Sequence, residues 1–251
     1  MATIAARPAA WRNDRRFFTG MAAAIVVTTF IGFAPTYYLL PYFGAVTARG
    51  VAGGASLTPL VHLHAVVFSG WMLLFLAQSS LVAAGRTDLH RILGIAALFL
   101  APVVIVLGLM TAIEAARHGS SPPGWDDKAF LLVPFASIAL FGGFFAAGFA
   151  YRRRADYHKR FMLLATMAML VPALARIMRL TEPPFLPPGV YGGLVVLNVF
   201  LIALVMFDLR RRGRLHPATL WGIAIYLTTW PARLTLGHAE PWQTFAQWVM
   251  A

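Results

Sequence analysis

The segment Ile92–Ile113 reads ILGIAALFLAPVVIVLGLMTAI and contains no charged side chain. A helix needs about 20 mostly apolar residues to cross the hydrocarbon core of a bilayer. Inside hydrocarbon, every backbone N–H and C=O group must be satisfied within the segment itself. This stretch therefore predicts a transmembrane helix.

Seven segments of this kind follow one another along the 251-residue chain, namely 17–43, 57–84, 92–113, 130–151, 161–178, 190–209 and 220–236. Hydrophobic residues make up 59% of the chain and charged residues 12%, against roughly half and a quarter in soluble domains. The segments do not have the alternating pattern of β-barrel strands, which are about 10 residues long. We predict an all-α, seven-transmembrane helix bundle that forms a single domain over residues 1–251.

Basic residues gather at alternate ends of these segments. Fifteen of the 21 Lys and Arg residues fall on one side: Arg7, Arg12, Arg15, Arg16, Arg86, Arg91, Arg152, Arg153, Arg154, Lys159, Arg160, Arg210, Arg211, Arg212 and Arg214. The positive-inside rule then predicts a cytoplasmic N-terminus and an external C-terminus. The net charge of +12 is explained by headgroup contact, so the expected partner is the lipid bilayer and not nucleic acid.

Three cytosolic loops resemble one another. In each, a His follows a basic cluster and a Pro lies further along the outgoing helix, giving the pairs His90 and Pro102, His158 and Pro172, and His216 and Pro231. The pattern predicts a degenerate helix-hairpin repeat. A proline inside a spanning helix removes one backbone hydrogen bond and bends the helix.

The histidines of these loops, His90, His158 and His216, are candidate metal ligands. If their helices are neighbours, three imidazoles converge on one metal ion, or two of them bind a haem iron from opposite faces. Asp156 and Asp208 are close enough in sequence to orient such ligands. The alternative is that these histidines are interfacial residues that contact headgroups.

A second group of polar residues is expected in the outer half of the bundle. It consists of His62, His64, Trp71, Arg176, Arg233 and His238. Ionisable residues within spans usually face a cavity or a partner. His62 and His64 point roughly 200° apart on a helix, so we expect only one of them, His64, to face the site, with Trp71 two turns further along the same face.

This outer group has several possible ligands. Histidines bind haem iron or a metal, and arginines pair with haem propionates, with a quinone headgroup or with an anionic lipid. The alternative is that Arg176 and Arg233 extend to the outer headgroups and pair with Glu182 or Glu240. The absence of cysteine excludes iron–sulfur clusters, thiolate metal sites and disulfides. Hydrolase and kinase motifs are also missing.

A resemblance covers most of the chain. It rests on Phe17-Phe-Thr-Gly-Met, Gly32-Phe-Ala-Pro-Thr-Tyr-Tyr, His64 with Trp71 and Gln78, and His158-Lys-Arg-Phe-Met-Leu-Leu-Ala-Thr. These residues resemble a family of uncharacterised bacterial polytopic proteins with seven helices, which implies a multi-pass protein of the bacterial inner (cytoplasmic) membrane. The chain is more loosely similar to b561-type cytochromes, in which histidines near both membrane faces hold haem b. It differs from them in that the segments 130–151 and 190–209 contain no histidine.

These observations favour an inner-membrane protein with a His/Arg-lined site in its outer half. The site is expected to bind haem, a metal ion or quinone in a redox setting, which includes electron transfer. The competing hypothesis is a non-catalytic accessory or scaffold subunit of a larger membrane complex. A transporter is the third reading, and it would need more polar residues near the midplane than Asn198 provides.

Overall fold

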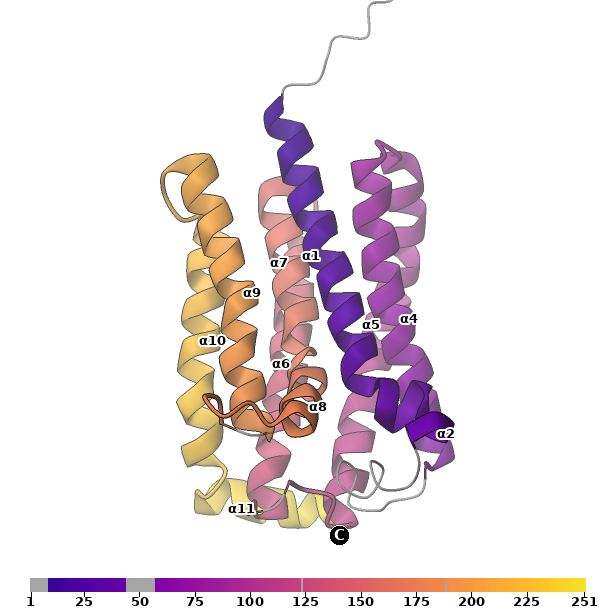
Figure 1. Ribbon diagram of the computed structural model, residues 1–251, viewed down its shortest axis with the longest axis vertical. Coiled ribbons are helices and arrows are strands. Elements are labelled where there is room, and N and C mark those ends of the chain that lie inside the picture. The colour runs from indigo at the N-terminus through magenta and orange to yellow at the C-terminus, as the bar shows by residue number, and fades with distance from the viewer. Residues whose placement is uncertain (1–8, 44–56, 123, 188) are drawn as a thin grey trace, which may run out of the picture.

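The computed structural model describes residues 9–43, 57–122, 124–187 and 189–251, and this part of the chain contains helices and no strand. The elements are α1 (Ala9–Phe33), the π-helix η1 (Ala34–Tyr38), α2 (Leu40–Phe43), α4 (Pro59–Ala83), α5 (Thr87–Arg117), α6 (Asp127–Ala150), α7 (Ala155–Ala168), α8 (Val171–Thr181), α9 (Gly189–Arg212), α10 (Pro217–Leu236) and α11 (Glu240–Met250). Figure 1 shows the long helices side by side, with α8 and α11 at one end. The predicted all-α class is confirmed for this part of the chain.

Five helical segments are long and apolar enough to cross a membrane. They are Asp14–Tyr38 (α1 with η1), α4, α5, α6 and α9, and the bent pair of α7 and α8 is a sixth if it forms one span. The side of α5 that faces away from the bundle carries exposed apolar residues at helical spacing, including Ile92, Ile95, Phe99, Val103 and Val106. An exposed apolar stripe of this kind fits contact with lipid. The structure thus supports a multi-pass membrane protein.

The predicted seventh span, residues 220–236, forms most of α10, which runs beside α9 (Figure 1). This helix lies outside the set of five or six candidate spans. Its threonines, its prolines and Arg233 keep its mean hydropathy below the level of the candidate spans. The seven-span arrangement therefore stays a prediction, as do the orientation of the termini and the repeat.

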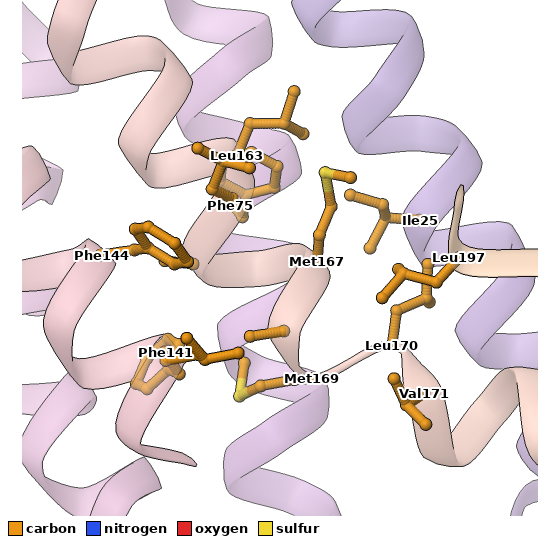
Figure 2. Close-up of a cluster of buried hydrophobic side chains, with 14 of the residues drawn as sticks. Ile25, Phe75, Phe141, Phe144, Leu163, Met167, Met169, Leu170, Val171 and Leu197 are labelled. Atoms are coloured by element: carbon orange, nitrogen blue, oxygen red, sulfur yellow. The ribbon is translucent and has the colours of Figure 1, made fainter. Parts of the chain in front are cut away.

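The predicted fifth span is a broken helix. Its two parts, α7 and α8, meet at an angle of 47°, and Pro172 lies in the first turn of α8, where its missing N–H costs nothing. By contrast, Pro102 and Pro231 lie inside continuous helices. Figure 2 shows that the break lies inside the core, where Met167, Leu170 and Val171 pack among side chains of α1, α4, α6 and α9.

Glycines bring α8 very close to two neighbouring helices. A side chain at Gly32 of α1 would collide with the backbone of Ala173, and one at Gly193 of α9 would lie 2.7 Å from the Ala175 nitrogen. Small residues at these positions permit the close approach of the helices. This packing fixes the position of α8 and of Arg176, which α8 carries.

The C-terminal segment forms the short helix that the sequence suggests. It is α11, which lies across the end of the bundle in Figure 1. The Trp242 indole donates to the Lys128 carbonyl at 2.7 Å, and the Arg117 guanidinium donates to the carbonyls of Met250 and Val249 at 2.9 and 3.0 Å. A cation is favourable at the carbonyl end of a helix, so Arg117 holds the end of α11 on α5.

Candidate functional site

The loops that carry the basic clusters lie at one end of the bundle, which we call the basic end. The turns between α4 and α5, between α6 and α7 and between α9 and α10 lie at this end, together with the start of α1 (Figure 1). The opposite end carries α8 and α11. We call it the distal end.

The structure separates the three histidines of the basic end. His90 and His158 lie together, with ring centroids 6.1 Å apart. His216 instead packs edge-on against Tyr157, at 4.5 Å. Within the described residues no three His, Asp or Glu side chains are placed to hold a metal ion. A three-imidazole site is therefore not formed.

Both ring nitrogens of His216 are already engaged. Nδ1 accepts the Ala218 N–H at 3.1 Å and so caps the start of α10, while Nε2 lies 3.0 Å from an Asp156 carboxylate oxygen. Because Nδ1 accepts, Nε2 carries the proton that is donated to Asp156. Burial lowers the pKa of His216 below its ordinary value of 6.5, so the ring is neutral at pH 7. His216 is a structural link between α7 and α10.

Next to His216 lies a buried ion pair that sequence reasoning missed. Arg160 of α7 and Asp208 of α9 are 2% and 0% exposed, and the Arg160 Nε lies 3.1 Å from an Asp208 oxygen. Asp208 also accepts the backbone N–H of His216 at 3.1 Å. A charged residue inside an apolar span needs a partner. This rule, applied to Asp208, would have predicted a buried cationic partner from the sequence.

A second ion-pair group ties α1 to the same end. Asp14 accepts from Lys159 at 2.7 Å and from Arg211 at 3.2 Å. The Lys159 ammonium also lies over the Phe18 ring, 4.9 Å from its centre. We call these contacts, together with Arg160–Asp208 and His216–Asp156, the basic-end network. It connects α1, α7, α9 and the start of α10.

At the distal end, the structure turns the two histidines of α4 to different partners, as their spacing predicts. Thr58 caps the helix by accepting the Val61 N–H at 3.3 Å, and Pro59 opens its first turn. His62 is exposed and lies 3.2 Å from the Tyr37 hydroxyl. His64 is half-buried, stacks on Phe68 with ring centroids 3.9 Å apart, and faces the Leu107 backbone.

Arg176 lies near enough to His64 at the distal end for its charge to act on the imidazole. The Arg176 guanidinium lies over Phe33, 4.3 Å from the ring centre, and donates only to the Pro172 carbonyl of its own helix, at 3.1 Å. The Nε of Arg176 and the Nδ1 of His64 are both buried and without a hydrogen-bond partner. An unpaired buried polar group costs about 1–3 kcal/mol. We call this pair the distal site.

The remaining predicted residues lie elsewhere. Trp71 is buried against Phe141 and donates to the Thr166 hydroxyl at 3.3 Å, so it links α4 to α7. Arg233 is 4% exposed and donates to the Ser137 hydroxyl of α6 at 3.2 Å.

His238 is exposed and directly follows α10. The helices α4 and α10 lie at opposite edges of the bundle in Figure 1, which separates His64 from His238. These two members of the predicted outer group therefore lie on, or directly after, helices at opposite edges of the bundle.

The distal site can hold an oxygen atom. Arginine offers only donors, whereas the unpartnered Nδ1 of His64 is a lone pair when the other ring nitrogen donates to the Leu107 backbone. Among the ion pairs of the described residues, none includes Arg176 or Arg233. The alternative, in which these arginines pair with Glu182 or Glu240, is thus not seen, and Arg176 has no carboxylate partner among the described residues.

Comparisons with models of known families, with curated proteins and with solved structures find no match. The resemblance to bacterial seven-helix proteins and to b561-type cytochromes therefore stays a prediction.

Proposed function

We propose that the chain is a seven-span protein of the bacterial inner membrane, with the basic end in the cytoplasm. The five or six candidate spans support it, and α10 adds a further span because it lies along α9 and exposes Leu220, Ile225 and Leu227. The side bias of Lys and Arg sets the orientation.

The cysteine-free sequence permits a direct test of this topology. Single cysteines replace His118 and Arg214, two exposed residues at opposite ends of the bundle. A membrane-impermeant maleimide is expected to label His118→Cys in spheroplasts, and to label Arg214→Cys only after the membrane is broken. The reverse labelling, or labelling of both in sealed spheroplasts, would refute the orientation. Ala251→Cys should behave like His118→Cys if α10 spans.

We further propose that the distal site binds the headgroup of a membrane quinone in a redox setting. The observations that support this are the buried Nδ1 of His64 and the buried Nε of Arg176, both of which lack a hydrogen-bond partner. A quinone carbonyl is an acceptor that fits the Arg176 N–H donor. The apolar stacking partners of the pair, Phe68 and Phe33, suit an aromatic headgroup.

Haem and metal ions fit this site less well than a quinone. His62 bonds Tyr37, and His238 belongs to the opposite edge of the bundle. The distal site therefore offers one imidazole, whereas a bis-histidine haem needs two and metal ions commonly take three or more protein ligands. An acidic lipid headgroup shares the acceptor chemistry of a quinone, so the experiment must separate these two.

The test is to purify the protein in mild detergent, extract the bound small molecules with organic solvent, and measure quinones and phospholipids by mass spectrometry. The wild type is expected to retain quinone, and His64→Ala and Arg176→Met to lose it. Arg233→Met is the matched control, because it removes a buried arginine elsewhere and should keep the quinone.

Equal quinone in the wild type and both site variants would contradict the proposal. Loss of an acidic phospholipid instead of quinone would replace the quinone with a lipid. Retention of neither, combined with co-purification of respiratory subunits, would favour the accessory-subunit hypothesis.

A further inference from the structure

The starts of α5 and α7 bring His90 and His158 together at the basic end. Their ring centroids lie 6.1 Å apart, and the ring planes meet at 84°. This contact is far from the distal site, because α4 and α5 turn into one another at the basic end while His64 lies near the other end of α4. The pair plays no part in the proposed quinone site.

Backbone groups orient both rings. The Nδ1 of His158 lies 2.8 Å from the Gly148 carbonyl, which can only accept, so Nδ1 carries the proton and Nε2 keeps a free lone pair. His90 interacts with the backbone of Gln78 in α4. Histidines that bind metals commonly donate their second N–H to a carbonyl in this way.

Unpaired polar atoms surround the contact. The Nδ1 of His90 and the side-chain oxygen of Gln78 are buried and have no hydrogen-bond partner. The Gln78 amide also lies close to Gly94, one turn after His90, because a β-carbon at Gly94 would be 3.7 Å from the amide nitrogen. An imidazole nitrogen of His90 and the amide oxygen of Gln78 are therefore left without partners, and the His90 ring lies 6.1 Å from the His158 ring between centroids.

The basic residues next to His90 and His158 repel a bound metal ion less strongly than their positions in the sequence suggest. Lys159 and Arg160 directly follow His158, but Lys159 pairs with Asp14 at 2.7 Å and Arg160 pairs with the buried Asp208. Arg91, next to His90, is exposed to solvent. The two basic residues that directly follow His158 in the sequence are thus neutralised by carboxylates of α1 and α9.

We propose that His90 and His158, with the Gln78 amide oxygen, bind a transition-metal ion of the class that prefers imidazole, Zn²⁺ or Cu²⁺. A metal–nitrogen distance of about 2.1 Å keeps the centres of two imidazoles that share an ion within about 6.5 Å of each other. The observed 6.1 Å lies within this limit. Water completes the coordination.

The test uses full-length protein in detergent, purified with a tag that contains no histidine and stripped with a chelator. Zn²⁺ is titrated by calorimetry, and Cu²⁺ is followed by electron paramagnetic resonance. The wild type is expected to bind one ion and to show hyperfine splitting from two nitrogens. Replacing either histidine should weaken binding by more than about 100-fold.

The variant His158→Asn separates binding from folding. The Asn amide can still donate to the Gly148 carbonyl in place of Nδ1 but has no counterpart of Nε2. It should keep the thermal midpoint of the metal-free wild type and lose the ion. His216→Asn and His238→Ala are controls that should keep binding, because neither residue belongs to the pair. His64→Ala, which tests the quinone proposal, should keep it too.

Three results would overturn the proposal. They are no binding by the wild type up to millimolar metal, equal binding by the wild type and the double variant His90→Ala/His158→Asn, and loss of binding in His216→Asn with the pair intact.

Discussion

The basic-end network and the distal site differ in whether their buried charged groups have partners within the chain. In the basic-end network, Arg160 meets Asp208, Lys159 and Arg211 meet Asp14, and a neutral His216 donates to Asp156. At the distal site, the Arg176 Nε and the His64 Nδ1 are buried without a hydrogen-bond partner. The basic-end network pairs its charged groups within the chain, whereas the distal site does not.

This difference indicates which buried polar groups stabilise the fold and which are available to bind a ligand. A buried charge needs compensation, and a charge that finds it inside the chain holds helices together. A buried donor that does not find an acceptor carries a cost that a ligand can remove. We therefore expect changes in the basic-end network to alter stability, and changes at the distal site to alter ligand binding.

The largest effect is expected from Asp208→Ala. It leaves Arg160 buried and uncompensated, which should lower the free energy of unfolding by about 3–5 kcal/mol. Unfolding in mixed micelles, followed by circular dichroism, measures this loss. The double variant Arg160→Met/Asp208→Leu replaces both charges by apolar side chains and should recover most of it. A double variant as unstable as the single one would show that the pair is not what holds α7 to α9.

The second effect concerns the packing that positions the distal site. Gly193→Ala places a β-carbon 2.7 Å from the Ala175 backbone nitrogen, so α8 must move, at a cost of about 1–3 kcal/mol. It should also reduce quinone retention, because α8 carries Arg176. Gly143→Ala is the control, since a β-carbon there meets nothing within 4 Å, and it should be neutral or slightly stabilising. Wild-type stability of Gly193→Ala would contradict the close packing.

The third effect is a dependence on pH at the basic end. Burial lowers the pKa of His216 in the folded protein below 6.5, so the unfolded chain binds the proton more readily. Stability contributed by His216 is complete above about pH 6.5 and falls as the pH is lowered towards the folded pKa.

The variant His216→Asn isolates this contribution. Asparagine keeps an acceptor for the Ala218 N–H at the start of α10, so the helix cap is preserved. Chemical denaturation at about pH 7.5 and about pH 5 measures the free energy of unfolding at each pH. This free energy should fall less for the variant than for the wild type as the pH is lowered. Identical slopes would exclude His216 as a titrating group of the network.

The smallest stability effect is expected from Arg176→Met. The change removes a cation–π contact worth about 0.5–1 kcal/mol, and it also removes a buried donor that has no partner. The two effects oppose each other, so unfolding of the ligand-free protein should change by less than about 1 kcal/mol. A loss as large as that of Asp208→Ala would mean that Arg176 is structural and would weaken the contrast between the two ends.

Apolar patterning predicts the helices and the break at Pro172, because both depend on local chemistry. The divergence of His62 and His64 also follows from helix geometry alone. The pairing of Arg160 with Asp208 does not, because residues on two separate helices meet only when the order of the helices around the bundle is known.

The same limit explains why the structure does not bring all the predicted residues of the outer group together. Counting residues places His64 and His238 at similar depth, but depth does not say which side of the bundle a helix occupies. The structure puts α4 and α10 at opposite edges (Figure 1), while the charge of Arg176 acts on His64.

The most direct test of the contrast is the thermal midpoint of unfolding with and without a short-chain ubiquinone, for the wild type, Arg176→Met and Asp208→Ala. A ligand at 100 times its Kd stabilises the folded state by about 2.7 kcal/mol. We predict a raised midpoint for the wild type and for Asp208→Ala, despite the lower starting value of the latter, and no shift for Arg176→Met. An equal shift in all three proteins would contradict the assignment of the distal site.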